Sequence, residues 1–235
     1  LFVFDNLASY LFFFATLGYL HTHSQVSAQA PKPIEQYLID LGAAGVVIAF
    51  ALVFYFVNIP GIRTSRALVR AITPSQAGLQ KNVESFEKAL SYNSFGTPET
   101  REQLIQGAMQ VANLQGLGQE DQSARVNLIN LAVREVEAQT VEVPNDVRYR
   151  LFAGALYDRI GRPDEAIRHL EEGKKLSPVK QQLLFELTVA YLAKKDYANA
   201  LISAKAAYEA DMTYQEAQRI YGLAALYARQ DTLAE

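Results

Sequence analysis

Hydrophobic and polar residues follow two different patterns along this chain, and the change comes near residue 60. Before it, apolar residues form long runs, whereas after it they recur at helical spacing with charged residues between them. The run Leu41–Ile59 holds no charge and, at about 1.5 Å per residue, is long enough to cross about 30 Å of hydrocarbon. A buried helix of a soluble protein rarely lacks a polar stripe over such a length. The pattern therefore predicts a transmembrane helix, with Tyr55 and Phe56 as aromatic anchors near one end.

A second apolar segment, Leu7–His21, has two interpretations. It is a second span if Leu1–Phe4 is included, or it is the apolar region of a signal peptide cleaved after the small-residue motif Ala28–Ala30. Asp5 stands where a signal peptide has basic residues, and no Met begins the chain, so we favour a second span. Because the chain starts inside an apolar run and stops where another helix is due, we expect a piece of a longer multi-pass protein.

Basic residues predict the orientation of these spans. Arg63, Arg66 and Arg70 follow the second span directly, whereas the loop between the spans offers only Lys32. The positive-inside rule therefore places the repeats in the cytoplasm and the loop between the spans outside. The segment Arg63–Thr73 reads as an amphipathic helix on the inner membrane surface, ended by Pro74.

The C-terminal half contains an internal repeat. Small residues recur thirty-four positions apart in two registers, which are Gly154, Thr188 and Gly222, and Ala166, Ala200 and Ala234. Small residues are needed where two packed helices cross closely. With Tyr157, Gly161, Leu170 and Pro178 at fixed offsets, the first unit resembles the tetratricopeptide consensus. That resemblance implies antiparallel helix pairs stacked into a solenoid.

These patterns together predict an all-α protein with two N-terminal transmembrane helices followed by an α-solenoid. We expect a membrane segment at 1–60, a juxtamembrane linker helix at 61–75, irregular helical repeats at 76–146 and tetratricopeptide repeats at 147–235, the last one truncated. Within the irregular part, Asn82–Leu90 reads as the second helix of a unit. Thr97 is the expected N-cap of a helix that starts at Pro98 and runs to about Gln115.

Composition removes several classes of chemistry. The chain has no cysteine, which rules out disulfides and thiolate sites. Removing Lys32 and three acids from totals of 22 and 25 leaves 21 basic and 22 acidic residues after residue 60, so nucleic acid is a poor partner. His21 and His23 form a lone pair, whereas metal sites usually need three or more ligands. Asp40 reads as an interfacial carboxylate, and Gly116–Gly118 lacks the Lys of a phosphate loop. We expect no catalytic, cofactor or metal site.

A partner-binding groove is the functional site that the repeats predict. In a tetratricopeptide solenoid the first helix of each unit lines the concave face. The positions that would line it here are Arg148, Leu151, Asp158, Arg159, Gln182, Phe185, Val189, Leu192, Arg219, Leu223 and Tyr227. This mixture is apolar with scattered charge and favours a helix or a hydrophobic peptide of a protein partner. The alternative is that some of them pack against the irregular units or a neighbouring subunit.

A more specific resemblance covers most of residues 1–115. The segments concerned are Phe2–Phe14 (FVFDNLASYLFFF), Asn58–Pro60 with Arg66–Leu68, Phe86–Leu90, and Phe95–Gly96 with Glu99 and Arg101–Leu104. They resemble bacterial O-antigen ligases and polymerases that carry C-terminal tetratricopeptide repeats. The resemblance implies transfer of a lipid-linked glycan outside the membrane, by residues of an external loop upstream of Leu1. His23-Ser24 is similar to that family's histidine and polar amide pair but precedes only a short loop, so we do not transfer the role.

Two functions follow from these observations. In the first, the chain is the C-terminal part of such a membrane protein, and its repeats dock other components of surface-glycan assembly. In the second, it is a stand-alone membrane-anchored scaffold without enzymatic activity. What precedes Leu1 distinguishes the two, and a soluble enzyme has little support.

Overall fold

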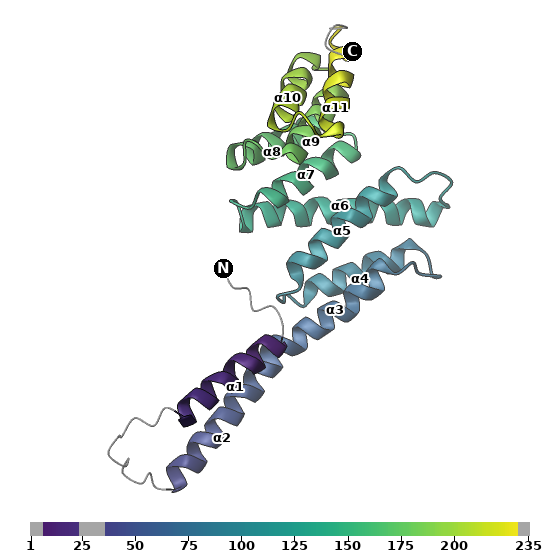
Figure 1. Ribbon diagram of the computed structural model, residues 1–235. Coiled ribbons are helices and arrows are strands. Elements are labelled where there is room, and N and C mark those ends of the chain that lie inside the picture. The colour runs from purple at the N-terminus through teal and green to yellow at the C-terminus, as the bar shows by residue number, and fades with distance from the viewer. Residues whose placement is uncertain (1–6, 24–35, 230–235) are drawn as a thin grey trace. The chain divides into compact units, whose positions relative to one another are not determined.

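The computed structural model describes residues 7–23 and 36–229, and nearly all regular structure in them is helical (Figure 1). The chain divides into two compact units, Leu1–Ala51 and Leu52–Glu235. The first unit contains α1 (Leu7–His23) and most of α2 (Gln36–Val53). The all-α prediction is confirmed for the described residues.

A single helical stretch among the described residues, Asp40–Ile72, is long and apolar enough to cross a membrane. The apolar part of α1, Phe12–His21, is shorter. Length and composition thus support one of the two predicted spans.

This helical stretch changes its winding in the middle, where its apolar run comes to an end. After α2 comes the π-helical η1 (Phe54–Asn58), where the N–H of Ile59 donates to the carbonyl of Phe54, and then α3 (Ile59–Ile72). Pro60, near the start of α3, has no N–H, and its ring clashes with the carbonyl four residues earlier. A wider turn ahead of the proline relieves that clash, so the helix continues.

The second unit begins with a helix pair that sequence analysis did not recognise as a pair. α3 buries Gly61, Thr64, Ala67 and Ala71, and it contacts α4 (Leu79–Ser91). The buried amide of Asn82 on α4 donates to the carbonyls of Ala71 and Thr73, each at 2.7 Å, and so satisfies the C-terminus of α3. The helix predicted to be juxtamembrane is therefore the first helix of a repeat-like unit.

The next pair is α5 (Thr97–Ala112) and α6 (Gln119–Glu142). A nearly buried arginine joins them, since Arg101 of α5 reaches Glu135 at 3.0 Å, Gln139 at 2.5 Å and Glu142 at 2.6 Å on α6. The expected N-cap was wrong by one residue, because Gly96 is the cap. Thr97 lies inside the helix, and its buried hydroxyl has no hydrogen-bond partner.

Regular pairs follow, namely α7 (Val147–Arg159) with α8 (Pro163–Leu176), α9 (Gln181–Ala193) with α10 (Tyr197–Ala210), and then α11 (Gln215–Tyr227). Each first helix ends in left-handed backbone at the same place in the repeat. Gly161 has φ 76°, Lys195 has φ 64° and Arg229 has φ 58°, thirty-four positions apart. Only the first of the three is a glycine, so the backbone repeats where the sequence does not.

The helix crossings also follow the repeat. A Cβ added to Gly154 would lie 2.9 Å from Leu170 Cδ1 and closer still to Leu170 Cγ, so α7 and α8 touch directly here. The equivalent positions in the next unit hold Thr188 and Ala204, both fully buried. A glycine facing a leucine is therefore replaced by a threonine and an alanine, which together carry the same number of side-chain heavy atoms.

A polar hub joins the irregular part to the regular repeats. Glu137 of α6 accepts hydrogen bonds from Tyr157 of α7 at 2.7 Å and from the fully buried His169 of α8 at 2.9 Å, while Arg168 lies at 3.1 Å. In the tautomer that carries its proton on Nε2, His169 donates to Glu137, and Nδ1 accepts from Arg150 at 3.4 Å. Burial lowers the pKa of His169 although Glu137 opposes this, so the ring is neutral near pH 7.

Candidate partner-binding surface

The first helices of the regular units form a continuous face. α7 contacts α9, and α9 contacts α11, so equivalent positions on the three helices are neighbours in space. Figure 1 shows α9, α10 and α11 packed together at the C-terminal end. Most of the groove positions that the repeat register predicts lie partly or fully exposed on these helices.

Exposed apolar side chains mark the part of this face on α9 and α11. Val189 of α9 is 43% exposed and Leu223 of α11 is 38% exposed, and they occupy equivalent positions thirty-four residues apart. Leu226 and Tyr227 extend the apolar surface along the last turn of α11. Scattered single apolar residues are normal on a surface, but a row along adjoining helices is typical of an interaction site.

Other predicted residues have structural roles. Leu151 is only 7% exposed and belongs to the core between α7, α8 and α9, so it does not line a groove. Phe185 is half-buried against Leu201 and Ile220, and Leu192 is half-buried as well. Leu151 and Phe185 therefore pack inside the regular repeats, which is neither of the two roles predicted for them.

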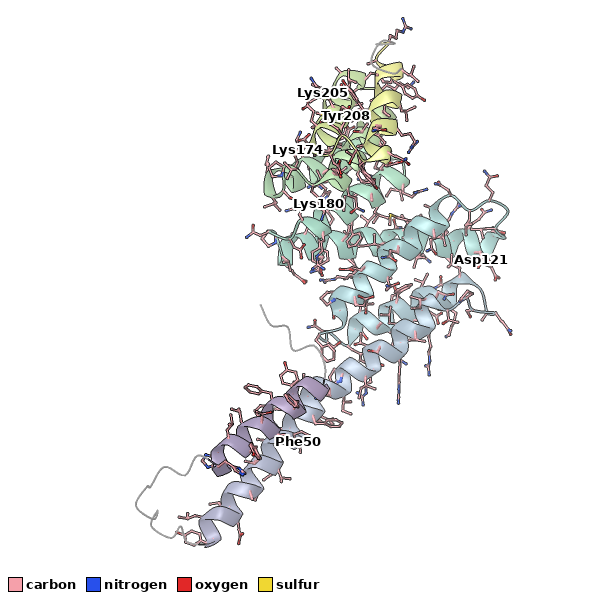
Figure 2. All side chains as sticks on the ribbon, in the orientation of Figure 1. Phe50, Asp121, Lys174, Lys180, Lys205 and Tyr208 are labelled. Atoms are coloured by element: carbon pink, nitrogen blue, oxygen red, sulfur yellow. The ribbon has the colours of Figure 1, made fainter. Side chains whose placement is uncertain are left out.

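Stacked aromatic rings stiffen this end of the chain, and sequence analysis did not predict them. Phe185 stacks on Tyr214 at 6.0 Å between ring centres, and Tyr227 stacks on Tyr197 at 5.7 Å. Tyr208 of α10, labelled in Figure 2, stacks on Tyr221 of α11 at 5.3 Å. Because the partners lie on different helices or turns, these contacts have no signature in a single helical period.

The charged positions fall into two groups. Arg148 pairs with Asp146 at 2.8 Å, and Arg219 pairs with Glu216 at 2.5 Å, so both cations are already neutralised by neighbours. Arg159 is exposed, and so is the uncharged Gln182. The paired arginines add little attraction for a partner, since exposed ion pairs are worth about 0–1 kcal/mol.

Two partly buried carboxyls lie beside the apolar row. Burial raises the pKa of Asp158, against the influence of Arg159, and Asp158 Oδ1 is buried without a hydrogen-bond partner. Burial also raises the pKa of Glu186 on α9, Asp158 raises it further, and Arg159 opposes both. Sequence analysis missed Glu186, because a glutamate on an amphipathic helix ordinarily faces water. The pair is the polar part of a mainly apolar surface.

In the part of the chain that the structure describes, no three His, Asp or Glu side chains lie close enough together to hold a metal ion. His21 and His23 lie in the last turn of α1, and His23 Nδ1 is 3.1 Å from the carbonyl of Tyr19.

Comparison with solved structures shows the fold. MamA 41-end from Desulfovibrio magneticus RS-1 is 15% identical, with a TM-score of 0.51 over 75% of this chain and 88% of that one. A MamA RS-1 double mutant is 16% identical, with a TM-score of 0.52 over 75% and 87%. TTC0263, a thermophilic TPR protein of Thermus thermophilus, is 17% identical, with a TM-score of 0.45 over 66% and 77%.

No family model matches the chain, and no curated protein matches its sequence. These matched structures do not support an O-antigen ligase parent, so that resemblance rests on the sequence alone. The repeated helix pairs, their thirty-four-residue period and the likeness to MamA agree with one another. The helices from α3 to α11 form a tetratricopeptide-like array of antiparallel helix pairs.

Proposed function

We propose that this protein is a membrane-anchored docking platform whose repeats bind a protein partner. The observation that carries the proposal is the row of exposed apolar side chains on α9 and α11, formed by Val189, Leu223, Leu226 and Tyr227. Water-exposed apolar surface along adjoining helices is stabilised when a partner covers it.

The partner that fits this surface is an amphipathic helix or a hydrophobic peptide segment. Val189 and Leu223 take the positions at which carboxylate-binding repeats use asparagine, so the surface does not suit a free C-terminal carboxylate. The nearby Arg148 and Arg219 already pair with acids. Affinity must therefore come mainly from apolar anchors spaced along one side of the partner.

The stretch Asp40–Ile72 supplies the anchor in this proposal. It has the length and composition of a span, and all of its apolar window is exposed in the structure. α1 has 17 residues, which is the lower end of the range for a transmembrane helix, and we propose it as a second span. The basic residues after Asn58 favour repeats on the cytoplasmic side of a bacterial inner membrane.

The wider context has two candidate forms. The platform belongs to an O-antigen ligase-like protein, where a lipid-linked glycan would meet the upstream part, or it is an independent scaffold. The sequence resemblance over residues 1–115 supports the first, and the tetratricopeptide-like fold alone suits both. The reading frame upstream of Leu1 separates them, because only the first form requires many further spans there.

Site-specific photo-crosslinking tests the docking surface. A photoreactive residue at Val189 or Leu223 of the full-length chain should crosslink one defined protein in cells, whereas the same residue at Ile202 should not. Ile202 lies on α10 and is 61% exposed, so it controls for accessibility. Equal crosslinking from all three positions, or none from α9 and α11, would show that this surface does not bind a partner.

Membrane placement has its own test. The chain should stay with membranes after alkaline carbonate extraction, and a protease added outside intact cells should leave the repeats uncut. Release by carbonate would refute the anchor, and external cleavage of the repeats would refute the cytoplasmic placement.

A further inference from the structure

The first helix pair of the second unit contains a basic cleft. α3 and α4 enclose a cavity of about 440 Å³ whose lining side chains are mostly polar or charged. The lining residues are Arg63, Arg66, Ala67, Arg70, Lys81, Glu84, Ser85, Lys88 and Tyr92. We call this cavity the α3–α4 cleft.

Helical spacing places the cations along the two walls. Arg63, Arg66 and Arg70 are spaced i, i+3 and i+7, which puts them in one row on α3. Lys81 and Lys88 are spaced i and i+7 on α4, and Ser85 lies between them. Because residues 73–78 turn the chain back on itself, the two rows face each other across the cleft.

The charges in the cleft do not balance. Five cations and one acid line it, and that acid, Glu84, pairs with Lys81 at 2.7 Å. Within residues 7–23 and 36–229, no ion pair joins Arg63, Arg66 or Arg70 to an acid. Like charges that face one another repel, so an anion between the two rows would relieve the repulsion.

The position of the cleft along the chain indicates where that anion comes from. The side chains of η1 are exposed and mainly apolar, and Arg63 follows Asn58 by little more than one helical turn. At about 1.5 Å per residue, Arg63 lies about 7 Å beyond the apolar segment. The polar headgroup layer on each side of a bilayer is about 5–8 Å thick. In a chain anchored by that segment, the Arg63 end of the cleft is thus at the depth of lipid phosphates.

We propose that the α3–α4 cleft binds the phosphate group of an anionic membrane lipid. This inference rests on the membrane anchor of the proposed function. The guanidinium groups of Arg63 and Arg66 bind phosphate oxygens in a forked geometry, Lys88 adds a point charge, and Tyr92 offers a hydroxyl. A lipid held here fixes the first repeat at the bilayer surface.

Lipid binding by the full-length chain tests the proposal. The chain is purified in a neutral detergent and titrated with phosphatidylglycerol or with phosphatidylcholine, and bound lipid is measured by native mass spectrometry. Phosphatidylglycerol should bind at least tenfold more tightly. Replacing Arg63, Arg66 and Arg70 by Gln should weaken its binding about 100-fold at low salt, since each basic residue near a charged surface contributes about fivefold.

A matched variant controls for net charge. Lys175→Gln, Lys180→Gln and Lys205→Gln remove three cations from the repeats beyond α7, where Figure 2 labels Lys180 and Lys205, and should leave lipid binding unchanged. The triple Arg→Lys variant keeps the charge and should restore most of the binding. Circular dichroism at 222 nm checks that every variant stays helical.

Three results would overturn the lipid site. They are equal affinity for the two lipids, equal loss of binding in the lysine control, and displacement of the lipid by millimolar inorganic phosphate, which would indicate a site for soluble anions. Flotation with pure phosphatidylcholine vesicles separates this inference from the anchor. A chain that floats but shows no lipid preference refutes the cleft alone, whereas a chain that does not float refutes the anchor.

Discussion

The crossing of α7 and α8 allows a quantitative test of how these repeats keep their shape. Gly154 faces the fully buried Leu170 there, and the next unit has Thr188 and Ala204 at the same two positions. Gly154→Thr alone places new atoms where Leu170 already lies. Leu170 cannot move aside because it is enclosed by the core between α7, α8 and α9. We expect Gly154→Thr to destabilise the protein by about 3 kcal/mol, the upper part of the range for overpacking.

The opposite change empties the same space. Leu170→Ala removes a fully buried side chain and should cost about 2–5 kcal/mol, because the cavity collapses only in part. If the two changes were independent, the double variant would lose about 5–8 kcal/mol. It instead recreates the threonine and alanine pair of the next unit, so we expect a loss of only about 1–2 kcal/mol, with a coupling of about 3 kcal/mol or more.

Thermal unfolding of the full-length chain in neutral detergent, followed at 222 nm, measures this cycle. For a chain of this size, 1 kcal/mol corresponds to about 2–4 °C in Tm. The double variant should therefore melt well above both single variants. Additive effects within about 0.5 kcal/mol would refute the explanation that two side chains share one volume at the crossing.

Further predictions concern polar contacts that join helices. The free energy of unfolding should fall as the pH drops below about 6.5. Burial lowers the pKa of His169 in the folded protein, so the histidine of the unfolded chain takes up a proton first and the unfolded state is favoured. His169→Gln should therefore make the Tm nearly constant between pH 7.5 and 5.5. Below a pH of about 4.5 the Tm of both proteins should fall further, because Glu137 has a lowered pKa in the folded state. Burial alone would raise that pKa, but the hydrogen bonds from Tyr157 and His169 lower it by more. Asn82→Ala should cost about 1–3 kcal/mol in thermal unfolding by leaving two carbonyls of α3 unpaired, and Asn82→Gln should not restore the loss if the short amide is needed. Arg101→Met should cost about 3 kcal/mol by the same measurement, with Arg101→Lys in between, because Glu135, 13% exposed, loses its buried partner and keeps only the exposed Arg134 at 3.2 Å.

The repeat architecture was predictable because helix crossings restrict side-chain size. Gly154 and Thr188 reported the thirty-four-residue period, and Pro163 and Gly161 gave the start of one helix and the end of another. The left-handed backbone at Lys195 was not predictable, since lysine has no preference for that conformation. The neighbouring turns impose it.

The role of α3 was missed for a different reason. Its sequence combines arginines with small residues, and the arginines suggested a helix on the membrane surface. The buried face includes Gly61, Thr64 and Ala67, which carry little hydrophobic signal, although Gly61 and Thr64 lie against the turn that follows α4. Small residues therefore predict a helix–helix contact only where they recur at a regular spacing. Those of α3 do not belong to the thirty-four-residue repeat.

The candidate surface shows the limit of position-based prediction. Repeat register correctly placed Val189 and Leu223 at exposed positions of adjoining helices, but it also included Leu151, which is buried. The position of a residue in the repeat indicates on which face of its helix it lies. Whether it is buried depends on the helix that packs against that face. Glu186 and the stacked tyrosines depend on such tertiary contacts and had no local signal.

The hub at Glu137 limits how this array can grow. His169 donates to a carboxylate that belongs to another helix pair, so the two pairs are matched to each other and not interchangeable. A repeat duplicated and inserted between α6 and α7 would leave that imidazole facing a newcomer with no acceptor. Gene duplication after α8 can therefore lengthen the array without breaking this hydrogen bond, whereas an insertion at the junction before α7 would break it.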